Sequence, residues 1–157
     1  MATTEDTLPH YREPSWFTRR VFNRLVLGLT RLGLSIRGSR ILEVPGRTTG
    51  RIQRVPVNLL HLDGRDFLVS PRGEGHWVRN VRAARGSLDL LLGRHRDHLL
   101  ARELPEGEEK LAVIRAYLER WDFEVGVFFD GLGAGSSEAD LALEAPKHPV
   151  FLLDRAT

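Results

Sequence analysis

Short extended segments separated by tight turns occupy the middle of the chain. Residues 54–62 and 65–70 form two such segments around Asp63-Gly64, a dipeptide that suits the positive φ angles of a tight hairpin turn. Further segments of the same kind are residues 40–44, 87–93, 97–105 and 149–154. About six strands therefore arrive largely in hairpin order, which favours an antiparallel sheet, closed into a small barrel, over a doubly wound parallel sheet.

Helical patterns flank these strands. Residues 16–34 form a basic amphipathic pattern, residues 76–85 fit a short basic helix, and residues 106–121 fit a longer helix that opens on acidic residues. Residues 123–145 add shorter helical turns and a loop. We therefore predict an α+β fold in which about six mostly antiparallel strands form a barrel with flanking helices.

The length of 157 residues fits one domain. We expect residues 1–14 to form a flexible arm and residues 15–157 to form the domain. The chain has no cysteine, the start lacks the apolar segment of a secretory signal, and no apolar run approaches the roughly 18 residues of a membrane-spanning helix. These features predict a cytoplasmic protein.

The charge of the chain is distributed unevenly. Residues 1–60 hold 10 Lys and Arg against 4 Asp and Glu, whereas residues 101–157 hold 6 against 12. Only Lys110 and Lys147 are lysines, so most cations are arginines, whose guanidinium suits phosphate and carboxylate. A GC-rich genome would produce the same bias. An anionic partner is expected at the basic half, but not nucleic acid, because aromatic residues are not interleaved with the arginines.

The most unusual stretch is VPGRTTGRIQRVPV, residues 44–57. Its glycines let the backbone turn and expose amide donors, its threonines offer hydroxyl groups, and its arginines supply positive charge. These residues are Gly46, Gly50, Thr48, Thr49, Arg47, Arg51 and Arg54. The spacing does not fit the G-x-x-x-x-G-K-[ST] phosphate loop. From the residues alone, a site for an oligoanion and a solvated basic hairpin both stay open, and the hairpin is favoured.

A second candidate is SPRGEGHWVRNVRAAR, residues 70–85. A strand end is followed by Arg72, two glycines and a helix, and the first amides of a helix can hold an anion. Trp77 could wall a planar ligand or pack in the core, and Asn80 offers both a donor and an acceptor. Consecutive hairpin strands would bring this loop and the 44–57 stretch to one side of the barrel.

Together the two stretches resemble the deazaflavin-dependent nitroreductase family. The shared pattern is G-R-x-[ST]-G followed by R-V-P-V (residues 46–57), S-x-[KR]-G (residues 70–73) and W-x-x-N-[LV] (residues 77–81). The similarity extends from about Trp16 to the terminal HPVFLL. It implies a split β-barrel that binds coenzyme F420, a deazaflavin with a phosphate and polyglutamate tail.

The resemblance also implies a set of cofactor-binding residues. Those implied for the anionic tail are Arg47, Thr48, Thr49, Gly50, Arg54 and Arg72. Those implied for the deazaflavin and its side chain are Pro56, Val57, Ser70, Trp77, Asn80 and Val81. Within the same motifs, Gln53, Val55, Pro71, Gly73 and His76 complete the candidate set.

The chain departs from the family pattern at several positions. Family members commonly carry a second cation at the position of Thr48 and an arginine at that of Gln53, so the tail contacts differ here. Some members place a tyrosine over the ring, where this sequence offers Phe128 and Phe129. No side chain stands out as a nucleophile or general base.

The expected activity is transfer of a hydride from reduced F420 to a quinone, enone or nitro compound. The alternatives are an FMN-binding split-barrel oxidoreductase and a non-enzymatic protein that binds F420 or lies on a membrane. A metal site is not expected, because His95 and His98 have no third ligand nearby. A homodimer is a further expectation, and residues 16–34 could contact an anionic membrane, although packing on their own domain is favoured.

Overall fold

The computed structural model describes residues 38–157, except for the side chains of residues 122–124 and 127. The expected N-terminal arm, residues 1–14, and the expected basic helix, residues 16–34, lie outside the described residues. Within the described part of the chain, no helix is both long and apolar enough to cross a bilayer.

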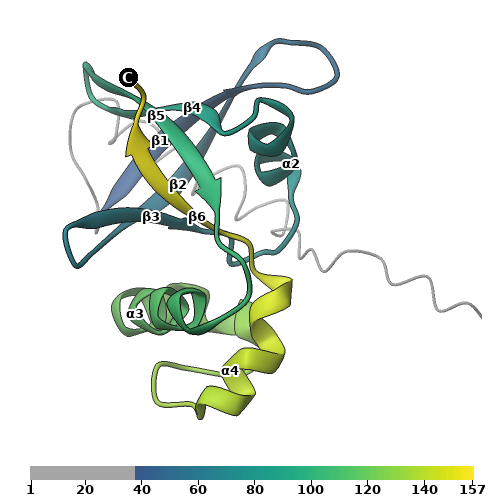
Figure 1. The fold of residues 1–157 in the computed structure, drawn as a ribbon, viewed down its shortest axis with the longest axis vertical. Helices are drawn as coiled ribbons and strands as arrows, with labels where there is room; N and C mark the ends of the chain where they lie inside the picture. Colours follow the sequence, from purple (N-terminus) through teal and green to yellow (C-terminus); the bar gives the residue numbers. More distant parts are fainter. Residues whose placement is uncertain (1–37) are drawn as a thin grey trace, which may run out of the picture.

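Six strands close into an antiparallel barrel (Figure 1), which confirms the predicted fold class. The strands are β1 (Ser39–Pro45), β2 (Ile52–Leu62), β3 (Arg65–Val69), β4 (Ser87–Leu92), β5 (His95–Glu103) and β6 (Val150–Arg155). Their order around the barrel is β1-β2-β3-β6-β5-β4, and β4 pairs with β1 to complete the ring. The last strand of the chain therefore lies between two strands that precede it.

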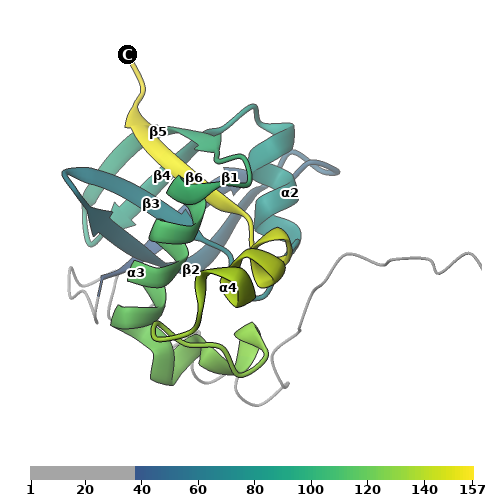
Figure 2. The same cartoon turned by 60° about the horizontal axis from the view of Figure 1, so that its bottom comes forward.

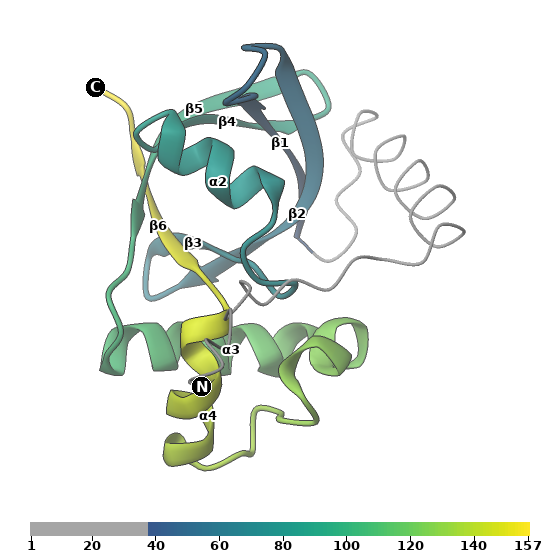
Figure 3. The ribbon, with the colours of Figure 1, turned by 90° about the vertical axis from the view of Figure 1, so that its right-hand side faces the viewer.

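Within residues 38–157, three helices flank the barrel, and two of them match the helices predicted at residues 76–85 and 106–121. They are α2 (His76–Ala83), α3 (Glu108–Val125) and α4 (Glu138–Glu144), and the 3-10 turns η1 (Gly126–Phe129) and η2 (Ala145–Lys147) follow α3 and α4. Trp121 has a non-helical φ of −128°, which places a kink in α3 at the predicted helix end. In Figure 3, α2 lies beside the barrel strands while α3 and α4 lie together below them.

Two apolar cores follow from the alternation of side chains along the strands. The barrel interior is filled from β1, β3, β4, β5 and β6, and α2 adds Val78 and Val81 to it. The second core lies between the outer face of the barrel and α3, η1 and α4, with Tyr117, Trp121 and Phe129 at its centre. Figure 2 shows α3 and α4 gathered against β3 and β6. The barrel is thus filled inside, and α2 is part of its core.

We predict that Gly86→Ala destabilises the protein by about 2–4 kcal/mol, because it combines backbone strain with a clash. Gly86 has a φ of +85°, and an added Cβ would lie 2.2 Å from the carbonyl oxygen of Ala101. Gly64→Ala is the matched control, since Gly64 has a φ of +74° with open space around it and should cost about 1–2 kcal/mol. Urea denaturation measures both; equal losses would contradict the close approach at Gly86.

Candidate functional site

The loop between β1 and β2, residues 46–51, is a compact hydrogen-bonded turn. The Gly46 amide donates to the Arg51 carbonyl and the Gly50 amide donates to the Gly46 carbonyl, both at 2.8 Å. Gly50 adopts a φ of +73°, which favours glycine. Arg47, Thr48 and Gly50 are all exposed. The turn thus displays its polar side chains to solvent on a fixed backbone.

Asn80 of α2 holds this turn against the helix. Its Oδ1 accepts one bond from the Arg47 backbone amide at 3.1 Å and another from Arg47 Nη1 at 2.8 Å. Arg47 Nη2 also lies 3.4 Å from Nδ1 of His76. Asn80 is only 3% exposed, and its Nδ2 has no partner within residues 38–157 as described. A buried amide donor is thus available beside a fixed guanidinium.

The N-terminus of α2 has no side chain that caps its first backbone amides. Its N-cap is Gly75, which offers no side-chain cap, and no acidic residue occupies the first turn. The first amides of such a helix carry partial positive charge and favour an anion. Since His76 and Asn80 belong to this helix, the open amides lie close to Arg47. The three kinds of donor converge on one end of α2.

The turn after β3, residues 70–73, leads into the N-terminus of α2, and the amide of its N-cap Gly75 donates to the Gly73 carbonyl at 2.9 Å. Ser70 Oγ donates to the Gly73 carbonyl at 2.6 Å, and the Gly73 amide returns a bond to the Ser70 carbonyl at 3.3 Å. The Arg72 guanidinium lies over the Phe128 ring, 4.6 Å from its centroid, which is a cation–π contact. Trp77 is half-buried and packs at 5.7 Å against Phe151.

The predicted residues on β2 divide between two faces. Val55 and Val57 pack against the interior core, so their strand neighbours Arg54 and Pro56 point to the outer face. Arg54 Nε there donates to Glu43 Oε1 at 2.6 Å. The structure therefore joins Arg47, His76 and Asn80 directly, and does not bring Arg54 into that group.

The remaining predicted residues show a gradient of burial. Thr49 and Gln53 are exposed, Pro71 is half-buried, and Ser70 and Gly73 are buried. Val81 is fully buried in the barrel core, so it packs α2 against the barrel. The two phenylalanines differ, because Phe128 contacts Arg72 whereas Phe129 is buried.

A cluster of charges on the outer face of β1, β2, β4 and β5 was not predicted. Glu43 is 6% exposed and accepts bonds from Arg54 and from Arg96 Nη1, the latter at 2.7 Å. Arg96 also binds Asp89, which accepts from His98 at 2.6 Å. Burial alone would raise the pKa of Glu43, but the bonds from Arg96 and Arg54 lower it below its ordinary value. The available sequence signal was a single acid in the otherwise apolar segment 41–44.

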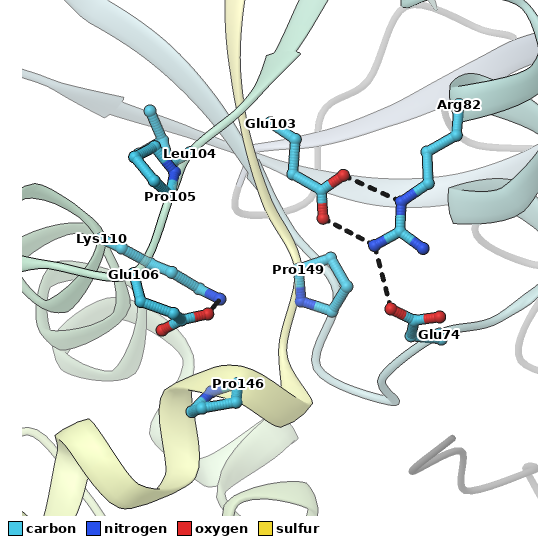
Figure 4. A pocket seen from close by; sticks show the side chains of 9 residues that line it. All are labelled: Glu74, Arg82, Glu103, Leu104, Pro105, Glu106, Lys110, Pro146 and Pro149. Atoms are coloured by element: carbon cyan, nitrogen blue, oxygen red, sulfur yellow. Dashed lines mark hydrogen bonds and ion pairs between the residues drawn. The ribbon is translucent and has the colours of Figure 1, made fainter. Parts of the chain in front are cut away.

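A cavity of about 410 Å³ lies beside Arg82 of α2, and none of the predicted residues lines it (Figure 4). Its lining is Glu74, Arg82, Glu103, Leu104, Pro105, Glu106, Lys110, Pro146 and Pro149. Arg82 binds Glu103 through two nitrogens and also binds Glu74, while Lys110 Nζ binds Glu106 at 2.5 Å. Because these charges already compensate one another, the cavity is less suited to binding an anion than the site formed by Arg47, His76 and Asn80.

No protein-family model matches the sequence, and no curated protein matches it significantly. Solved structures do share the fold. An F420-H2-dependent reductase (FDR-A) gives a TM-score of 0.51 at 21% identity, covering 75% of this chain and 95% of its own. A protein described as a domain-swapped dimer gives 0.53 at 20% identity, covering 90% and 100%. A candidate pyridoxamine 5′-phosphate oxidase from Listeria innocua gives 0.51 at 12% identity, covering 90% and 94%.

We predict that Glu43→Gln lowers the free energy of unfolding by about 1–2 kcal/mol at pH 7, because it removes the charge that Arg54 and Arg96 share. The pKa of Glu43 is lowered in the folded state, so its stabilisation is present above the ordinary value of 4.5 and is lost as the pH falls through the folded-state pKa. The difference from the wild type should therefore shrink between pH 7 and pH 2.5 in urea titrations. Glu119→Gln, at an exposed position of α3, is the control. A constant difference across this range would argue against the buried charge.

Proposed function

We propose that the chain is an oxidoreductase of the split-barrel type that binds reduced coenzyme F420 and uses it to reduce an electron-poor small molecule, such as a quinone, enone or nitro compound. The observation that carries the proposal is the group of fixed donors at one end of α2: Arg47, the Nδ2 of Asn80 and the open helix amides. The fold shared with an F420-H2-dependent reductase supports it.

The residues present suit a ligand with several negative charges. Arg47 and Arg51 have no acidic partner within the described residues, and Arg72 adds a guanidinium from the neighbouring turn. Fixed guanidinium groups bind phosphate and carboxylate oxygens without reorganising. We assign the tail of F420 to these cations together with Thr48, Thr49 and Gly50. Arg54 would contribute only if its bond with Glu43 is exchanged for one to the tail.

A planar ring needs apolar walls and a few amide donors. Trp77, Pro71 and Phe128 are partly exposed near the 70–73 turn and would supply the walls. Asn80 Nδ2 would donate to a ring or side-chain oxygen. When bound, the deazaflavin would supply the hydride, while these residues orient it and exclude water.

Binding of FMN is the second candidate. The pairing of Arg54 with Glu43 favours it, because one cation fewer is free for a long anionic tail and FMN carries a single phosphate. A protein that sequesters F420 without turnover would use the same residues, and steady reduction of a quinone by reduced F420 separates it from an enzyme.

A homodimer is part of the proposal, supported by the relative described as a domain-swapped dimer. Contact of residues 16–34 with an anionic membrane is a separate proposal. Sedimentation with and without vesicles that contain anionic lipid would test both for the full-length chain.

We predict that Arg47→Ala weakens F420 binding about 10- to 100-fold, the loss expected for one charge-assisted contact. FMN binding should fall by less, because it presents fewer charges. Fluorescence titration with F420 and FMN measures both affinities.

Arg94→Ala is the matched control, since Arg94 lies in the β4–β5 turn at the opposite end of β1 from the 46–51 turn. It should leave both affinities unchanged. Tight binding of FMN with none of F420 would overturn the main proposal, and equal losses in the two variants would show that Arg47 acts only through net charge.

A further inference from the structure

His148 is a fully buried histidine at the end of η2, with 0% of its surface exposed. Its ring stacks on Phe129 at a centroid distance of 3.9 Å and an interplanar angle of 19°. Nδ1 lies 3.2 Å from the carbonyl oxygen of Ser70, and Nε2 lies 2.9 Å from Oε1 of Glu144. No sequence motif marks His148 or Glu144, although their i,i+4 spacing permits a pair.

The ring of His148 lies between two hydrogen-bond acceptors. A backbone carbonyl can only accept, so Nδ1 donates to Ser70. Oε2 of Glu144 receives a bond from Lys147 Nζ at 3.0 Å, which leaves Oε1 to face Nε2. A proton on Nε2 satisfies this oxygen as well, so the two partners of the ring suit an imidazolium.

The charges around this imidazolium form a chain. His148 pairs with Glu144, Glu144 pairs with Lys147, and Lys147 also binds Asp130 at 3.0 Å. Bonds from Glu144 and then Asp130 raise the pKa of Lys147, so this cation persists throughout the neutral range. The carboxylate of Glu144 therefore stays compensated from both sides, and α4, η2 and the residue after η1 are linked.

The Ser70 carbonyl lies at the start of the 70–73 turn. It accepts from the Gly73 amide as well as from His148, and the Ser70 amide donates to the Pro149 carbonyl at 2.9 Å. The same turn carries Arg72, whose guanidinium lies over Phe128, next to the phenylalanine that stacks on His148. The buried ring of His148 thus anchors the backbone that presents Arg72.

We propose that His148, held as an imidazolium between Glu144 and the Ser70 carbonyl, is a positioning residue that fixes the 70–73 turn for binding of the anionic cofactor. This inference rests on the proposed function for the identity of the ligand. A neutral ring would keep its remaining proton on Nε2, beside the Glu144 carboxylate, so the Nδ1 bond to Ser70 is lost when the ring loses a proton. The affinity for the cofactor should therefore fall as the pH is raised into the alkaline range.

The protonation state can be read directly by ¹⁵N NMR of the histidine side chains in the full-length wild-type protein. At pH 7.5 a histidine with the ordinary pKa of about 6.5 is mostly neutral. We expect both ring nitrogens of His148 to carry protons there, and the Gly73 amide signal to shift when His148 titrates. A neutral ring at pH 7.5, or a Gly73 signal that ignores the titration, would overturn the proposal. Neither readout needs F420, so the result stands apart from the proposed function.

Glu144→Gln tests the consequence for binding, because it removes the charge that holds the second proton. We expect the fall in F420 affinity at alkaline pH to disappear in this variant, because a neutral ring opposite the glutamine amide can keep its proton on Nδ1 and its bond to Ser70. His98→Gln is the control, since His98 is an exposed histidine paired with Asp89 on the barrel surface. A Glu144→Gln variant that loses thermal stability but keeps the wild-type pH profile of binding would show that the pair is only structural, and would refute the positioning role.

Discussion

Burial of α2 against the barrel core is the constraint on which the candidate site depends. Val78 and Val81 are fully buried in that core, which fixes the rotation of the helix about its axis. With those positions inside, Asn80 is directed to the 46–51 turn and Arg82 to the opposite side, where it binds Glu103. The same apolar contacts that stabilise the barrel therefore place the open helix N-terminus beside the basic turn.

Pairing with acids separates the arginines into two groups. Arg54 and Arg96 are bound to the buried Glu43 on the barrel surface, and Arg82 is bound to the exposed Glu103 at the cavity beside α2. Arg47 instead uses the neutral oxygen of Asn80, which holds its guanidinium in place without cancelling its charge. A fixed but uncompensated cation is what recognition of an anion requires. The sequence alone cannot make this distinction, because both groups consist of arginines and only the fold shows which of them meet an acid.

Local features account for what the sequence predicted well. Asp63-Gly64 forms the expected tight turn, with both residues at positive φ, and the acidic opening of α3 is followed by a helix. Contacts between distant segments account for the rest. One such contact is the insertion of β6 between β3 and β5. Two others are the pairing of Glu43 with Arg96, 53 positions apart, and the bond from His148 to Ser70, 78 positions apart. No turn signal or periodicity encodes such pairs, and the alternation that sends Arg54 away from Arg47 becomes visible only when the register of β2 is known.

The central claim is that one end of α2, together with the 46–51 and 70–73 turns, receives an anionic cofactor. Mapping backbone amide shifts by NMR while F420 is added to the ¹⁵N-labelled protein tests it most directly. The account predicts that the largest changes fall on residues 47–51, 72–73 and 76–80, and that the residues around Glu106, Lys110 and Pro146 stay unchanged. Changes centred on that second group would place the ligand in the cavity beside Arg82 and would contradict the account.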